Sequence, residues 1–237
     1  MRITADTNAR EFRAALERYI RVTRRGVPGA IRQQGRLLMA RVTSFTPPRT
    51  LSQGRKAVKR DIHRAVQPFG VRGVRSPRLR ELLRARDYSG LNAFAENVPN
   101  LPKRWEPFSE GLHSGARGSR GRVHRPTGVA TPDTDAVASY VKRKQGMVGQ
   151  GRGGWVTALQ RLGGKAPAFA ARHAGAGTFR DTLGDDLRGE LVAENRSGWA
   201  SSGDPDGVIS RAMRSRAVSV IKAADKALER AGRSSLK

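Results

Sequence analysis

The chain has 237 residues, of which 46 are Lys or Arg and 20 are Asp or Glu, so its formal net charge at pH 7 is +26. It contains no cysteine, which excludes disulfides and every metal site that needs a thiolate. No stretch approaches the roughly 20 apolar residues of a membrane-spanning helix, so no membrane partner is expected. The length predicts a single domain over residues 1–237.

The excess of positive charge points to an anionic partner. The positive charges of a chain with so large a net charge repel one another when the chain is isolated. Nucleic acid, an acidic protein surface or an anionic membrane would each reduce that repulsion. Of the 46 cations 37 are Arg, whose planar guanidinium binds phosphate and carboxylate groups bidentately. The alternative is a solvated basic surface from a GC-rich genome, because net charge informs about partners and not about the fold.

The N-terminal third predicts helices separated by glycine and proline. The first begins after Asn8 and ends at Gly26, and the second begins at Pro28 and ends before Pro47. Ser52 is a candidate cap for the third, in which Ala57 belongs to the expected buried face. The third and fourth helices are predicted over residues 53–66 and 78–86.

Residues 97–132 are interpreted as a basic arm inserted within the domain. Prolines and glycines alternate along this segment, and little periodic apolar pattern remains. Connections of this length without regular structure are uncommon and are usually functional or disordered. We therefore expect an extended, irregular, Arg-rich segment that becomes ordered only when it meets a partner.

The second half of the chain completes a predominantly helical α+β fold. Asp133 or Thr134 can cap the next helix, and Asp204 with Pro205 begins a long C-terminal helix that Gly232 follows. Long N- and C-terminal amphipathic helices are expected to pack with a small sheet. The other predicted elements are a helix over 135–145, a helix near 154–162 and a strand over 187–195.

No motif in the sequence predicts catalysis or a cofactor. The glycines at 149, 151 and 154 match the spacing of a dinucleotide-binding loop, but the basic run at 141–145 before them cannot be a buried strand. These glycines are interpreted as a flexible hinge between two helices. The histidines lack metal-ligand spacing, so surface or packing roles are expected for His63, His113, His124 and His173. We expect a protein without enzymatic activity, cofactor or metal.

The basic arm is the strongest candidate contact surface, for DNA phosphates or for a neighbouring subunit. A disordered, solvated loop is the alternative. The candidate contact residues are Arg104, Arg117, Arg120, Arg122, Arg125, Lys142, Arg143 and Lys144. A second group of cations, on the predicted helix 53–66, is interpreted as a solvated helix face; it comprises Arg55, Lys56, Lys59 and Arg60.

Three segments together resemble minor structural proteins of tailed bacteriophages. The first is FTPPRT at 45–50 with QGRKAVKRDI at 53–62. The second is VGQGRGGWVTA at 148–158, and the third is LVAENRSGWA at 191–200, before a long helix rich in small residues. In this order they resemble the tail-completion, neck and head–tail joining group.

The resemblance implies a virion protein that works by assembly and without catalysis. Members of this group form rings, often hexamers, where the tail tube meets the head, and packaged double-stranded DNA passes through or ends there. The partners implied are further copies of the chain, other neck and tail proteins, and DNA, with assembly in the bacterial cytoplasm. The alternative is a basic cellular nucleic-acid-binding protein of a ribonucleoprotein particle.

Overall fold

The computed structural model describes most of the chain as two compact units. Unit 1 comprises Met1–Arg49 and Gly149–Lys237, and unit 2, Thr50–Val148, is inserted between these two parts. The fold is mostly helical with small sheets, which confirms the predicted predominantly helical α+β class. The expected single domain stays a prediction. The described residues are Ala14, Glu17, 27–118, 121–123, 125–184, 189–198 and 204–234.

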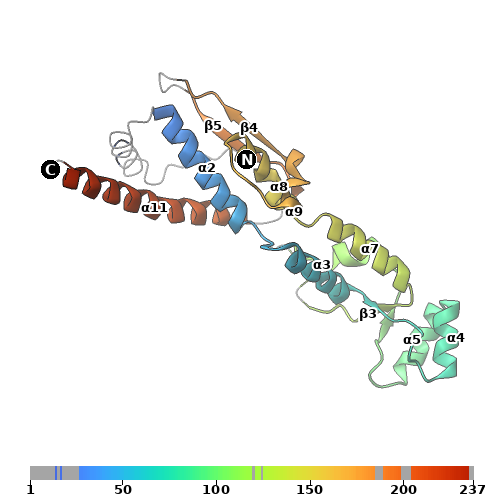
Figure 1. Cartoon of the computed structure of the whole chain (residues 1–237). Helices are drawn as coiled ribbons and strands as arrows, with labels where there is room; N and C mark the ends of the chain where they lie inside the picture. The colour runs from blue at the N-terminus through green and yellow to red at the C-terminus, as the bar shows by residue number, and fades with distance from the viewer. Residues whose placement is uncertain are drawn as a thin grey trace. The chain divides into compact units, whose positions relative to one another are not determined.

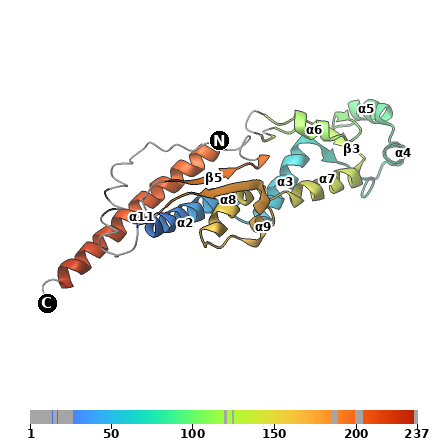
Figure 2. The ribbon, with the colours of Figure 1, turned by 90° about the horizontal axis from the view of Figure 1, so that it is seen from above.

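Unit 1 packs helices against a two-stranded antiparallel sheet (Figures 1 and 2). The elements are α2 (Val27–Phe45), α8 (Gln150–Arg161), α9 (Ala168–Ala171), a 3-10 turn (Ala174–Ala176), β4 (Gly177–Asp181), β5 (Leu191–Asn195) and α11 (Pro205–Ser234). In the core, Val42 of α2, Leu159 of α8 and Val208 of α11 are almost fully buried. Phe179 of β4 and its cross-strand partner Ala193 of β5 pack against this cluster from the sheet.

The predicted boundaries of the helices and of the strand in unit 1 hold in part. The helix expected from Pro28 is α2, and α11 begins at Pro205, where the Asp204 carboxylate accepts a hydrogen bond of 2.9 Å from the Gly207 N–H. The predicted stop at Gly232 is wrong, because α11 continues to Ser234; a glycine ends a helix only when it adopts a left-handed conformation. The predicted strand 187–195 corresponds to β5 from Leu191 onward. The helix expected after Asn8 lies outside the described residues, apart from Ala14 and Glu17.

The expected glycine hinge between two helices is wrong for every glycine after Gly149. Gly149 caps α8 in a left-handed conformation with a φ of 105°, but Gly151, Gly153 and Gly154 lie buried inside the helix. A Cβ atom at Gly154 would overlap the side chain of Asn195, which instead donates a 2.7 Å hydrogen bond to the Gly151 carbonyl. These glycines therefore allow the sheet to approach the α8 backbone closely, and do not serve flexibility.

Arg152 connects the start of α8 to the C-terminal end of α2. Its guanidinium is buried and donates to the backbone carbonyls of Ser44 and Thr46, at the C-terminal end of α2. Burial and the charge of Arg49 lower its pKa, but an arginine remains charged in proteins. The positive charge at the negative end of the α2 dipole fixes the start of α8 against α2.

Unit 2 contains short helices around a three-stranded parallel sheet of order β1-β3-β2. Its elements are α3 (Leu51–Ala65), β1 (Gln67–Pro68), α4 (Pro77–Ala85), α5 (Tyr88–Glu96), β2 (Arg104–Trp105), α6 (Glu110–Gly115), β3 (Val129–Thr131) and α7 (Thr134–Gly146). One apolar cluster joins Ile62 of α3 to Val137 of α7. A second joins Leu82 of α4, Leu91 of α5 and Trp105 of β2.

Sequence patterns located most helices of unit 2 to within two or three residues. The helices predicted over 78–86 and 135–145 are α4 and α7. The predicted cap of α3 is wrong: Thr50 caps the helix by accepting a 3.2 Å hydrogen bond from the Gln53 N–H, and Ala57 is exposed. The helix α5 was not predicted.

The basic arm differs from the expected irregular segment. Residues 97–132 contain β2, α6 and β3, and Trp105 and Val123 are almost fully buried in the clusters of unit 2. The few apolar residues of this segment are widely separated in sequence, which hides any periodicity, yet they enter the core of unit 2. No helix in the described part of the chain is both long enough and apolar enough to span a lipid bilayer.

Candidate polyanion-binding surface

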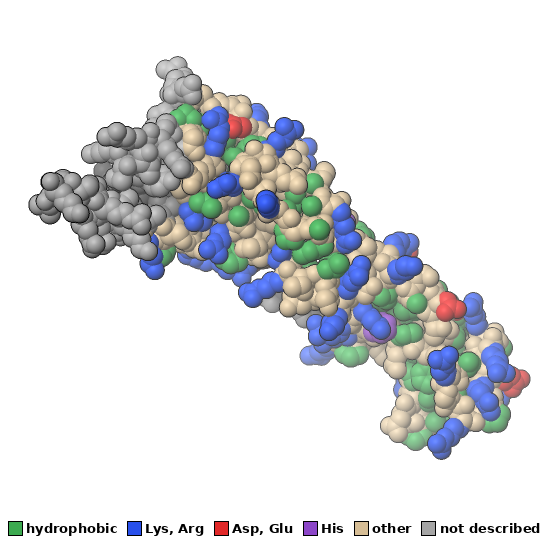
Figure 3. Space-filling view, in the orientation of Figure 1, with side chains coloured by type: hydrophobic (Ala, Val, Ile, Leu, Met, Phe, Trp, Pro, Cys, Tyr) green, Lys and Arg blue, Asp and Glu red, His purple; other side chains and the backbone are tan. Residues whose placement is uncertain are grey.

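Unit 2 carries far more positive than negative charge. Residues 50–148 include 20 Lys or Arg against 8 Asp or Glu, a net charge of +12. Six of the eight carboxylates already hold an ion pair or a helix cap within the unit; they are Asp61, Glu81, Asp87, Glu106, Glu110 and Asp133. Figure 3 shows Lys and Arg side chains spread over the visible face of this unit with few acidic side chains among them.

Three of the residues predicted to contact a partner have intramolecular carboxylate partners. Arg104 pairs with Glu106, and Arg143 pairs with Glu110. The third, Arg117, lies with its Nε 3.6 Å from the Asp61 carboxylate. The arginine side chains of these pairs are 47–64% exposed, so the pairs neutralise charge and add little stability.

The other predicted contact residues lie on the loop between α6 and β3 and on α7. Arg122 and Arg125 are exposed on the loop between α6 and β3, and Lys142 is exposed on α7. Lys144 lies with its Nζ 5.3 Å from the centre of the Tyr140 ring, at cation–π distance. Arg120 lies outside the described residues. A contact role for these residues stays a prediction.

The exposed cations of α3 form a surface of a different kind. Arg55, Lys56, Lys59 and Arg60 are exposed, and none of them has a carboxylate of the described residues within ion-pairing distance. The first turn of α3 holds no acidic residue, and Asp61, which follows these cations, is held by other partners. We call these four residues the α3 cation cluster.

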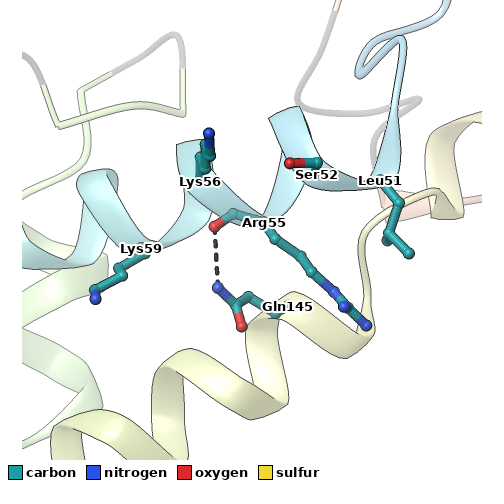
Figure 4. Close-up of a pocket in the computed structure, with 6 residues that line it drawn as sticks. All are labelled: Leu51, Ser52, Arg55, Lys56, Lys59 and Gln145. Atoms are coloured by element: carbon teal, nitrogen blue, oxygen red, sulfur yellow. Dashed lines mark hydrogen bonds between the residues drawn. The ribbon is translucent and has the colours of Figure 1, made fainter.

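A hollow lies between this cluster and α7 (Figure 4). Its volume is about 410 Å³, and its lining residues are Leu51, Ser52, Arg55, Lys56, Lys59 and Gln145. The Gln145 side-chain amide donates a 3.0 Å hydrogen bond to the Arg55 carbonyl, which ties the end of α7 to α3. Arg55 and Lys59 extend on the side of α3 where Gln145 lies, and Lys56 points away from it. Positive charges therefore line the hollow, with hydrogen-bonding groups beside them.

The surroundings of His63 in α3 lower the pKa of its imidazole. Burial, and then the charge of Lys59 one turn earlier, lower the pKa of its imidazole. A neutral imidazole is therefore favoured near neutral pH. His63 adds no positive charge to the α3 cation cluster under these conditions.

The histidine of the basic arm has a structural role. The buried His113 ring lies 3.0 Å from the Asp61 carboxylate through Nε2 and 3.0 Å from the Tyr140 hydroxyl through Nδ1. The other oxygen of Asp61 accepts a 2.9 Å hydrogen bond from the Val123 N–H. This network ties α6 and the loop after it to α3 and α7. Within the described ranges, no three His, Asp or Glu side chains gather to hold a metal ion.

Two of the three segments that carry the phage resemblance meet in unit 1, and the first lies mostly in α3 of unit 2. The second segment forms α8 and the third includes β5, and Gly154 of one packs against Asn195 of the other. Comparison of the chain with known protein families, with curated proteins and with solved structures finds no match.

Proposed function

We propose that this chain is a non-enzymatic structural protein of a tailed bacteriophage, which assembles as a ring that joins the tail tube to the head beside the DNA path. The observation that carries the proposal is the α3 cation cluster, whose charges have no carboxylate partner among the described residues of the unit. An assembly that places an anionic partner against unit 2 would stabilise this arrangement. The resemblance of the three sequence segments to neck and tail-completion proteins supplies the kind of assembly.

The two units suit different tasks in such a ring. Unit 1 holds the residues of α8 and β5 that carry the resemblance, so we assign the contacts between subunits to it. A ring needs head-to-tail contacts, in which one surface of each subunit binds a different surface of the next. Unit 2 carries the α3 cation cluster and is inserted as one continuous segment, Thr50–Val148.

A cellular nucleic-acid-binding protein is the second candidate, and the same α3 cation cluster favours it. The two candidates differ in assembly, because a ribonucleoprotein component needs no closed ring. They also differ in where the protein resides, since a neck protein stays in the finished virion at the head–tail junction.

Loss of the protein tests the proposal. An amber codon early in the gene of the encoding phage is expected to give DNA-filled heads and separate tails in a non-suppressing host, because the joining ring is missing. Negative-stain electron microscopy of the lysate measures this outcome, and a suppressing host is the control. Joined, infectious particles in the non-suppressing host contradict the proposal.

A further inference from the structure

We infer that the α3 cation cluster and the hollow beside it bind the phosphate backbone of a nucleic-acid duplex. The inference rests on the proposed function only in that both place an anionic partner against unit 2. It assigns the contact to α3 and the end of α7, and not to the arginines of the basic arm. Two arginines of the arm, Arg104 and Arg117, are held by carboxylates of the same unit, whereas those of the cluster are not.

The spacing of the cations suits a linear array of negative charges. Arg55 and Lys59 are four residues apart on α3, as are Lys56 and Arg60, so each pair is about 6 Å apart along the helix axis. The helix thus presents two parallel rows of positive charge. A duplex carries one negative charge about every 1.7 Å of its axis, and few biological surfaces offer such a continuous array.

Uncharged donors in the hollow suit phosphate oxygens. Ser52 presents a hydroxyl, and the Gln145 amide already donates to the Arg55 carbonyl, which fixes the position of this part of α7. Hydroxyl and amide side chains together with Arg and Lys make most of the phosphate contacts in protein–DNA complexes. A rigid pair of helices loses little conformational entropy when it binds.

The composition of the hollow argues against other anionic partners. Leu51 is the one apolar side chain in its lining, so the site lacks the apolar face that inserts into a membrane surface. No aromatic side chain lines it, and stacking on aromatic rings is the usual means of binding single strands. Contacts from these cations to phosphates alone carry no base information, so binding is independent of sequence and sensitive to salt.

A triple substitution tests the site against a control of equal charge. The test variant is Arg55→Ser, Lys56→Ser and Lys59→Ser, and the control variant is Arg72→Ser, Arg75→Ser and Arg84→Ser, three exposed arginines before and within α4. Binding to a labelled duplex of about 20 base pairs is followed by fluorescence anisotropy from about 50 to about 300 mM KCl. The slope of log K against log salt is expected to become shallower by about 2.7 in the test variant, at about 0.9 per lost phosphate contact, and to change little in the control.

Three outcomes overturn the inference. One is an equal loss of slope in the two variants. Another is a full-length protein that does not bind the duplex at all. The third is displacement of the duplex by polyglutamate as effectively as by unlabelled duplex at equal charge, which assigns the surface to an acidic protein.

A second measurement applies if the test variant does not fold. Lysine acetylation of the unmodified protein, read by mass spectrometry, is expected to fall at Lys56 and Lys59 when duplex is present and to stay unchanged at the exposed Lys165 of unit 1. Equal protection of all three lysines, or of none, contradicts the site. A ring that does not bind duplex overturns this inference alone, and duplex binding without a ring overturns only the proposed function.

Discussion

Substitution of Gly153 by alanine is expected to destabilise unit 1 by about 3 kcal/mol, the upper end of the usual cost of overpacking. A Cβ atom at this position would overlap the backbone carbonyl of His173, which cannot move away by a change of side-chain rotamer. Helix propensity alone predicts the opposite sign, because alanine stabilises a helix interior by about 1 kcal/mol relative to glycine. Urea unfolding of the two proteins, monitored by circular dichroism, measures the difference.

Gly29 provides the matched control for this substitution. It lies in α2, and nothing approaches within 4 Å of the place where a Cβ atom would stand. Gly29→Ala is expected to leave stability unchanged or to raise it by about 0.5–1 kcal/mol. Equal effects of the two substitutions would contradict the close packing of α8 described above.

Loss of the Asp61 carboxylate is expected to have the second large effect. Asp61→Ala leaves the Val123 N–H and the Nε2 of buried His113 without their acceptor, and it removes the carboxylate beside Arg117. Breaking a largely buried polar network of this kind costs about 2–4 kcal/mol. The loop after α6 should also detach from α3, so trypsin cleavage after Arg122 should accelerate.

Glu81 is the control for this second prediction. Its pair with Arg78 on α4 is more than 60% exposed on each side, so Glu81→Ala is expected to change stability by less than about 0.5 kcal/mol. Unfolding in urea and limited proteolysis followed by mass spectrometry measure the two variants together. An Asp61→Ala protein as stable and as resistant to trypsin as the Glu81→Ala protein would show that the network does not hold the basic arm.

The starts of several helices could be predicted, because a helix cap depends on residues that are close in the sequence. Hydrogen bonds from the first turns of α3, α4 and α11 are accepted by Thr50, Ser76 and Asp204. Cap residues of this kind can be recognised in the sequence, although the predicted cap of α3 is Ser52 and not Thr50. The helix α5 is as long as the predicted α4, but Gly90 in its first turn weakens the helical pattern. The glycines of α8 were misinterpreted because their use depends on how closely distant segments approach, which local sequence does not encode.

The partners of the cations in the candidate site could not be predicted either, because they also depend on contacts between distant segments. The sequence reveals the cations of the basic arm and of α7 but not their partners. Arg104 and Arg117 of the arm and Arg143 of α7 face carboxylates. The α3 cation cluster was interpreted as a solvated helix face. Its distinguishing features are the lack of carboxylate partners among the described residues and the hollow toward α7, and both depend on the tertiary structure.

The most direct test of the proposed function is the oligomeric state of the purified full-length protein. Native mass spectrometry and negative-stain microscopy are expected to show one closed ring of fixed stoichiometry, either free in solution or on added tail tubes from the encoding phage. The proposal assigns to unit 1 the head-to-tail contacts that such a ring needs. A protein that stays monomeric at every concentration, at low and high salt and in the presence of tail tubes, would contradict the account.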